Sequence, residues 1–185
     1  MKPQKKNTYV QLLDRLNELE SEGRVNDIEL ARVERRAKSL QKVDSPGAFC
    51  VLGAIACLKG RLQESRWYHE KSIYWSNDNP HMIHNYGASL HRFGYLSEAM
   101  SYSLEAYSNT KNPEFLNLAI LCAIHLGLHN YAKSLIEEWE TLTSEEHEFR
   151  KNLNENDGEI RTEVKDLLSR DLTNDEDLWK ELADT

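Results

Sequence analysis

Histidine is the residue type in this chain whose spacing suggests chemistry. His81, His84 and His91 recur at helical intervals, so a helix through them would carry all three on one stripe. Only His81 and His84 are close enough to share a metal ion, because His91 would lie about 10 Å further along the axis. No carboxylate or cysteine is spaced to complete a tetrahedral set. The stripe favours hydrogen-bond donors on a binding surface over a metal site, with an ordinary solvated face as the alternative.

Other residues of catalytic type lack the spacing of enzyme motifs. The glycines occur singly, so they form no phosphate-binding loop, and neither His-Glu-x-x-His nor Gly-x-Ser-x-Gly occurs. Cys50, Cys57 and Cys122 lie in apolar segments, which predicts buried thiols and not nucleophiles. An odd number of cysteines without metal-type pairing suits a reducing compartment. We expect a cytoplasmic protein that is not an enzyme and needs no cofactor.

Composition and charge limit the partners. Hydrophobic residues make up 39% and charged residues 29% of the 185, which is typical of a soluble globular protein. No apolar run approaches the roughly 20 residues of a membrane span. Residues 143–185 carry 14 acidic and 6 basic side chains and account for the whole net charge of −8. An acidic chain is a poor direct binder of nucleic acid, which requires clustered Lys and Arg.

Prolines and glycines indicate the elements that position the histidines. Three internal prolines, each after a Ser or Asn, are spaced 34 and 33 residues apart, and a glycine follows each of them by 14 residues. Ser or Asn before proline predicts a helix start, and the glycine predicts a turn into a second helix. The residues are Ser45-Pro46 with Gly60, Asn79-Pro80 with Gly94, and Asn112-Pro113 with Gly127.

Small residues keep the same period. Ser65, Ala99 and Ala132 each follow a turn glycine by five residues, where two helices must approach closely. Gly53 and Gly87 fall at one equivalent position inside the first helix of their repeats. Glycine inside a helix costs about 1 kcal/mol relative to alanine, so a close packing contact is expected there.

This two-helix unit resembles the tetratricopeptide repeat. Three repeats cover residues 46–142, and residues 8–42 are similar to a degenerate N-terminal helix pair. Ile120 replaces the first-helix glycine in the third repeat, and Phe49, Ile83 and Leu116 stand where the family has tryptophan. The resemblance implies an all-α, right-handed superhelical stack of helix-turn-helix repeats, in which residues 1–142 form the repeat domain and 143–185 an acidic helical cap or tail.

The family binds ligands along the first helices of its repeats, which line a concave groove. When the family's ligand-binding positions are carried onto the second and third repeats, the resemblance places these residues in the groove: His81, His84, Asn85, Ala88, His91, Arg92, Asn117 and His125. It implies a scaffold or chaperone-like adaptor for a protein or peptide partner, with no membrane involved. The groove would become more basic below pH about 6.5, where free histidine gains charge.

The acidic tail offers a second hypothesis. Residues 143–146 predict a helix start, and residues 158–170 an amphipathic helix that caps the repeats. Residues 173–182 predict a short acidic helix whose partner-binding residues would be Asp175, Asp177, Leu178, Trp179 and Leu182. The protein would then be an antitoxin or inhibitor, whose tail neutralises a basic, nucleic-acid-processing partner.

Two further expectations concern packing. The aromatic residues Trp67, Tyr68, Tyr74 and Trp75 are expected in the core and between repeats. The chain could be a monomer or a homodimer, and an uncovered first helix pair could dimerise through Leu12, Leu13 and Leu16.

Overall fold

The structure is a computed structural model that describes residues 8–150, and all secondary structure in that range is helical. This confirms the predicted all-α fold of helical repeats. The right-handed superhelix remains a prediction. The chain divides into two compact units, Met1–Ser89 and Leu90–Thr185, and one helix, α5, contributes residues to both. In order, the helices are α1 (Thr8–Ser21), α2 (Asp27–Leu40), α3 (Ser45–Leu58), α4 (Leu62–Trp75), α5 (Pro80–Arg92), α6 (Leu96–Thr110), the 3-10 helix η1 (Pro113–Phe115), α7 (Leu116–His125) and α8 (His129–Thr143).

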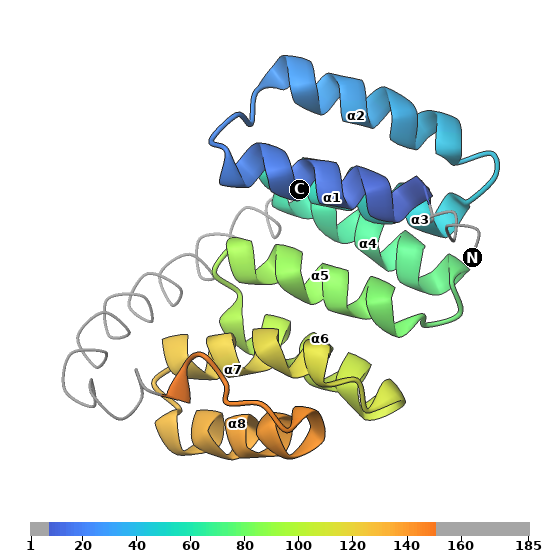
Figure 1. Ribbon diagram of the computed structural model, residues 1–185. Helices are drawn as coiled ribbons and strands as arrows, with labels where there is room; N and C mark the ends of the chain where they lie inside the picture. The colour runs from blue at the N-terminus through green and yellow to red at the C-terminus, as the bar shows by residue number, and fades with distance from the viewer. Residues whose placement is uncertain (1–7, 151–185) are drawn as a thin grey trace, which may run out of the picture. The chain divides into compact units, whose positions relative to one another are not determined.

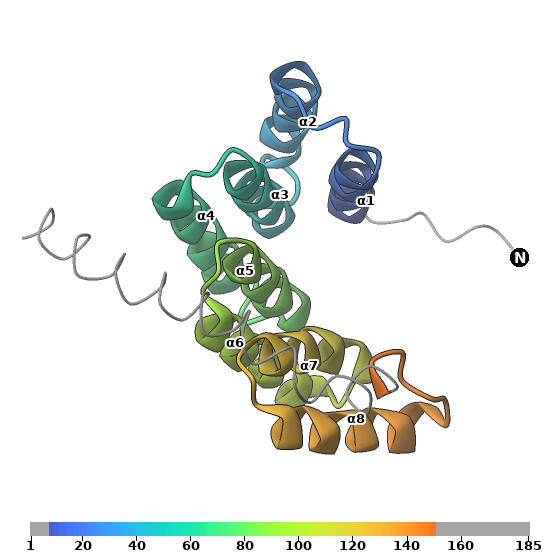
Figure 2. The ribbon, with the colours of Figure 1, turned by 90° about the vertical axis from the view of Figure 1, so that its left-hand side faces the viewer.

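In the first unit, α3 is the central helix (Figures 1 and 2). It packs against α1, α2 and α4, and its sequence is apolar on nearly every side. Helices that are apolar all round are usually buried. The core joins Val51 and Ile55 of α3 to leucines of α1 and α2.

The N-terminal helices α1 and α2 form a helical hairpin. The helices α1 and α2 flank a turn at Gly23, whose φ is 63°, and Asn26 caps α2 by accepting the Ile28 and Glu29 amides. Leu12 and Leu16 are buried in the unit core and Leu13 packs against it. These leucines therefore do not form the uncovered dimer face considered from the sequence.

The proline signals correctly mark helix starts, although one cap differs. Asn79 Oδ1 accepts the His81 amide at 2.9 Å, and Asn112 Oδ1 accepts the Glu114 amide at 3.1 Å. Ser45 was expected to cap α3, but Asp44 does so by accepting the Gly47 amide, and Ser45 is already helical. Asp44 is the N-cap because its carboxylate accepts the amide of the third residue after it, which is the usual N-cap hydrogen bond.

The buried face of α4 is polar. Ser65 donates to the Gly53 carbonyl at 2.9 Å, and Ser72 donates to the Pro46 carbonyl at 2.7 Å. Between them His69, which is fully buried, shares a 2.8 Å hydrogen bond with the Ser89 hydroxyl and stacks on Tyr86. A Cβ at Gly53 would lie 2.7 Å from the His69 ring, which confirms the close contact predicted for this glycine.

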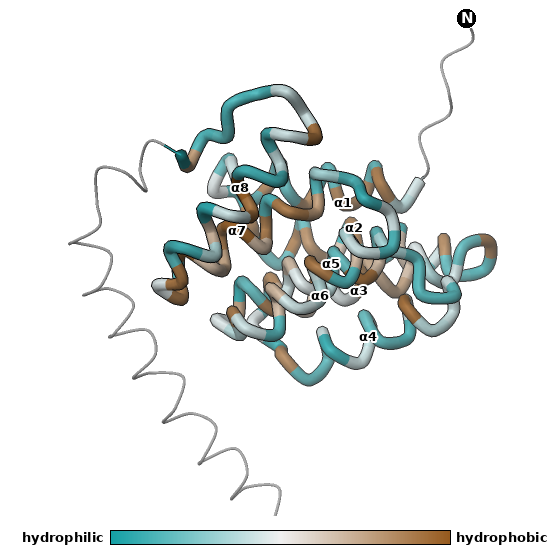
Figure 3. The backbone as a smooth tube through the Cα atoms, turned by 90° about the horizontal axis from the view of Figure 1, so that it is seen from below, coloured by the Kyte–Doolittle hydropathy of each residue, from teal (hydrophilic) through white to brown (hydrophobic). Residues whose placement is uncertain are grey.

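The second unit is built around α7, which packs against α6 and α8. The buried residues of this unit include Ala99 of α6 and Ala132 of α8, both predicted from the repeat spacing. Tyr107 of α6 donates to Glu138 of α8 at 2.5 Å. The colours along α8 alternate between hydrophilic and hydrophobic positions, as expected of a helix with one buried face (Figure 3).

The predicted helix start at residues 143–146 is wrong. Thr143 ends α8, and Ser144 adopts the left-handed conformation with φ of 60° that closes the helix. Residues 144–149 are not helical, with bends at 144–145 and a turn at 148–149. The predicted helices at 158–170 and 173–182 lie outside the described residues.

Candidate functional site

The predicted groove residues of the first unit lie on α5, beside the other first helices. In this unit α1 packs on α3, and Asn85 of α5 donates to Cys50 Sγ of α3 at 3.4 Å. His81 is exposed at the start of α5, whereas His84 and Ala88 are half-buried. The structure therefore places both α1 and α5 against α3, and α5 carries imidazole groups at its surface. Asn85 is engaged with Cys50.

Two of the predicted groove histidines of the second unit pair with each other. His91 Nε2 lies 3.3 Å from His125 Nδ1, and the rings stack with centroids 5.4 Å apart. One nitrogen of this pair must carry a proton and the other must accept it. Both rings are half-buried, and Arg92 beside them is exposed.

The pairing changes the charge expected of this region. Burial lowers the pKa of His91, and the neighbouring His125 and Arg92 lower it further. His91 therefore gains charge at a lower pH than free histidine does, contrary to the expectation from the sequence.

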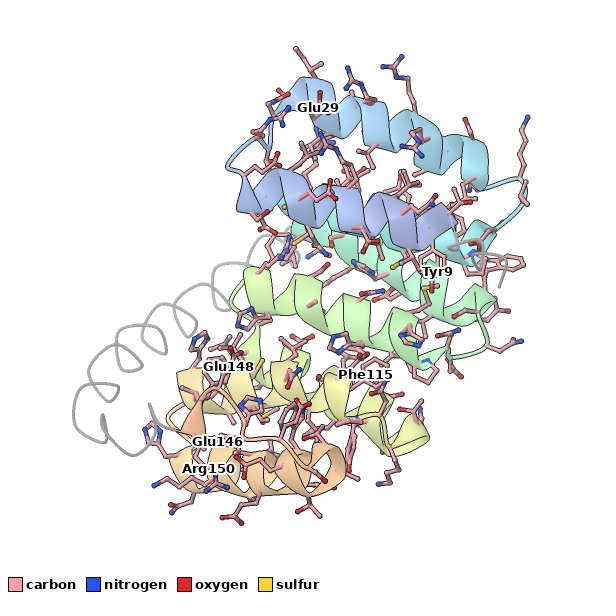
Figure 4. All side chains as sticks on the ribbon, in the orientation of Figure 1. Tyr9, Glu29, Phe115, Glu146, Glu148 and Arg150 are labelled. Carbon is pink, nitrogen blue, oxygen red and sulfur yellow. The ribbon has the colours of Figure 1, made fainter. Side chains whose placement is uncertain are left out.

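The side chain of Asn117, a predicted groove residue, is hydrogen-bonded to another residue of the same chain. Its Oδ1 accepts a hydrogen bond from His147 Nε2 at 3.1 Å, in the segment that follows α8. The His147 amide donates to Glu140 Oε1 at 3.0 Å, and two nitrogens of Arg150 donate to the same carboxylate. Figure 4 labels Arg150 beside α8. The Trp139 ring contacts the His147 ring edge-on. We call residues 144–150 the strap, since they fold back onto α7 and α8.

The strap fixes one neutral form of His147. Nε2 must carry the proton, because Asn117 Oδ1 can only accept, and Nδ1 accepts the Phe149 amide at 3.3 Å. A protonated ring would lose the bond to Phe149. Burial is the largest cause that lowers the pKa of His147, although Glu148 and Glu140 oppose it.

Replacing His147 by alanine is expected to loosen the strap without unfolding α7 and α8. Both ring hydrogen bonds would be lost, and each is worth about 1 kcal/mol. Amide exchange of residues 144–150, followed by mass spectrometry, should accelerate roughly 10-fold or more. Glu145→Ala is the matched control, because that side chain is exposed in the same segment. Equal exchange in His147→Ala and the unaltered protein would contradict this role.

The aromatic residues of α4 correct another expectation. Trp67, Tyr74 and Trp75 are 51%, 73% and 58% exposed, so they are not core residues. Their spacing places them on one face of α4, with Lys71 Nζ 5.7 Å from the Trp67 ring centroid. Only Tyr68 is half-buried, against the core. Exposed tryptophan and tyrosine are frequent anchors of protein interfaces.

The predicted cysteine and tail assignments have different outcomes. Cys50, Cys57 and Cys122 are buried, and burial raises the pKa of the Cys50 thiol to about 12, as expected of unreactive thiols. The predicted tail residues lie outside the described range: Asp175, Asp177, Leu178, Trp179 and Leu182.

Within residues 8–150, no three His, Cys, Asp or Glu side chains gather as a metal-binding group. No helix in that range is long and apolar enough to cross a membrane. Comparisons of the chain with protein-family models, with curated proteins and with solved structures each gave no match. The tetratricopeptide resemblance therefore remains a prediction that rests on residue spacing.

Proposed function

We propose that the protein is a non-enzymatic cytoplasmic scaffold or chaperone-like adaptor of the tetratricopeptide type, which binds a segment of a protein partner along its first helices. One observation supports the proposal above others. In the first unit α1 packs on α3, α5 is hydrogen-bonded to α3 through Asn85, and α5 carries an exposed His81 and a half-buried His84. Imidazole groups in a row on one helix suit the carbonyl and carboxylate oxygens of a bound peptide.

The test is recovery of the partner from the native host with the tagged full chain at moderate salt, identified by mass spectrometry. We expect one stoichiometric partner, whose retention falls at least 10-fold in the double variant His81→Ala/His84→Ala. That drop corresponds to about 1.4 kcal/mol, within the range of two lost hydrogen bonds. The melting temperature of the variant serves as the folding check.

Trp67→Ser/Trp75→Ser is the matched control on another helix. Retention that survives the histidine changes but not the tryptophan changes would move the binding surface from α5 to α4, and the groove proposal would be wrong.

The inhibitor function is the second candidate, and the concentration of acidic residues in 143–185 favours it. In that case a basic, nucleic-acid-processing partner would be lost when residues 171–185 are removed. Its binding would weaken steeply with salt, because exposed charges are screened. The scaffold function predicts that the same deletion is tolerated.

A further inference from the structure

The second helix of the first unit borders an open pocket that sequence reasoning missed. It has a volume of about 680 Å³ and lies against α2, near the first residue of α1. Pockets of this size accommodate a few side chains of a ligand. The lining is formed by Thr8, Arg32, Arg35, Arg36, Ser39, Leu40 and Val43.

The three arginines follow one stripe of α2, and their charge is only partly balanced. Arg32 pairs with Glu29 at 2.9 Å, a carboxylate that also lies 3.7 Å from Arg15. Within residues 8–150, neither Arg35 nor Arg36 forms an ion pair, and Arg35 donates only to the Ala31 carbonyl of its own helix, at 3.4 Å.

Glu34 of the same helix does not supply the missing charge. Glu34 is bound by Lys38 at 2.6 Å and Lys59 at 2.8 Å, which lower its pKa to about 2. The pocket therefore keeps a surplus of positive charge. Arginine forks bind carboxylates with two parallel hydrogen bonds.

Apolar surface lies beside these guanidinium groups. Val43 is 88% exposed directly after α2, and Leu40 is half-buried next to it. A nucleic-acid backbone or a free anion would leave this surface uncovered, whereas an acidic peptide with a bulky side chain would cover it.

We propose that the α2 pocket binds an acidic segment of a partner protein, with two carboxylates on Arg35 and Arg36 and a bulky apolar side chain against Leu40 and Val43. This surface is separate from the α5 residues of the proposed function. It would contribute to binding even if the histidine face did not.

The test is fluorescence polarisation with the full chain and a labelled synthetic peptide of the sequence SEDELLWEDS, which is acidic, carries leucine and tryptophan, and does not occur in the chain itself. Arg35→Ser/Arg36→Ser should weaken binding at least 10-fold, as should an isosteric peptide with Asn and Gln in place of Asp and Glu. Val43→Ser should weaken it several-fold. Arg24→Ser, an exposed arginine in the turn before α2, is the matched control and should bind as the unaltered chain does.

Three results would overturn the proposal. The first is equal affinity for the acidic and the amide peptide. The second is binding that is seen only after residues 171–185 are removed, because the pocket would then belong to the chain's own tail. The third is preferential, arginine-dependent binding of a single-stranded oligonucleotide over the peptide. Thermal melting of each variant shows whether a loss of binding reflects unfolding.

Discussion

Replacing Gly53 by alanine should lower the free energy of unfolding by about 1–3 kcal/mol, although alanine is the better helix former. The new methyl group would lie 2.7 Å from the His69 ring. That ring is held in place by the Ser89 hydroxyl and by stacking on Tyr86, so it cannot swing aside cheaply. In an unobstructed helix the same change would stabilise by about 1 kcal/mol, which makes the sign of the effect informative.

Urea unfolding of four proteins measures the effect: the unaltered chain, Gly53→Ala, His69→Ala and the double variant. His69→Ala removes the ring, so Gly53→Ala should cost much less in that background. Gly60→Ala is the control, because open space surrounds that position and only its φ of 70° opposes alanine. Its cost of about 1 kcal/mol should be the same with or without His69. A Gly53→Ala protein as stable as the unaltered one would refute the close contact.

Acid should destabilise the protein well above the pH at which carboxylates titrate. Burial without compensating charge lowers the pKa of His69 to about 3, and Nδ1 has no partner among the described residues. The unfolded chain binds a proton near pH 6.5, whereas the folded chain does not until about pH 3. Stability is therefore complete above pH 6.5 and declines as the pH falls towards 3, by up to about 1.4 kcal/mol per pH unit.

Chemical unfolding between pH 8 and pH 5 isolates this contribution from that of Glu34, whose window lies between 4.5 and about 2. We expect a loss of about 2 kcal/mol attributable to His69 over this range. His69→Leu should flatten the slope, even if the variant is less stable at every pH. His91 and His147, whose pKa values are also lowered, account for the slope that remains. An unchanged slope in His69→Leu would show that the ring is not buried in the neutral form.

The helical hairpins were predictable because their boundaries follow local backbone rules. Pro46 and Pro80 lie at helix starts, and Gly60, Gly94 and Gly127 all adopt positive φ in the turns. These positions depend on ring closure and on the absence of a side chain, not on distant contacts. The choice of Asp44 over Ser45 as a cap was not decided by spacing, since both side chains can cap a helix.

The orientation of α4 was mispredicted for a physical reason. Its buried face carries Ser65, His69 and Ser72, and its exposed face carries Trp67 and Trp75. Hydrophobic patterning therefore points to the wrong side of this helix. The hydrogen-bond acceptors on α3 and the hydroxyl of Ser89 explain why polar groups face inwards, and the repeat spacing predicted this for Ser65 but not for His69.

The candidate site was predicted in part. His81, His84 and Ala88 share α5 as the spacing indicated, and His91 and His125 proved to be neighbours. Asn117 is covered by the strap, which the sequence had suggested was a helix start. Thr143 and Ser144 suit either end of a helix, and the left-handed conformation of Ser144 is not encoded by residue type alone.

The contact between Gly53 and His69 also restricts which hairpin halves can associate. The equivalent positions of α7 and α8 hold Ile120 and Ile136, both buried. An imidazole ring as large as that of His69 would meet the Ile120 side chain on α7, whereas α3 leaves room for it. The α4 helix therefore does not fit against α7, although Gly87 gives α5 the same open position that Gly53 gives α3. Mispairing of helices is a characteristic hazard of repeat proteins, and this size match disfavours the pairing of α4 with α7.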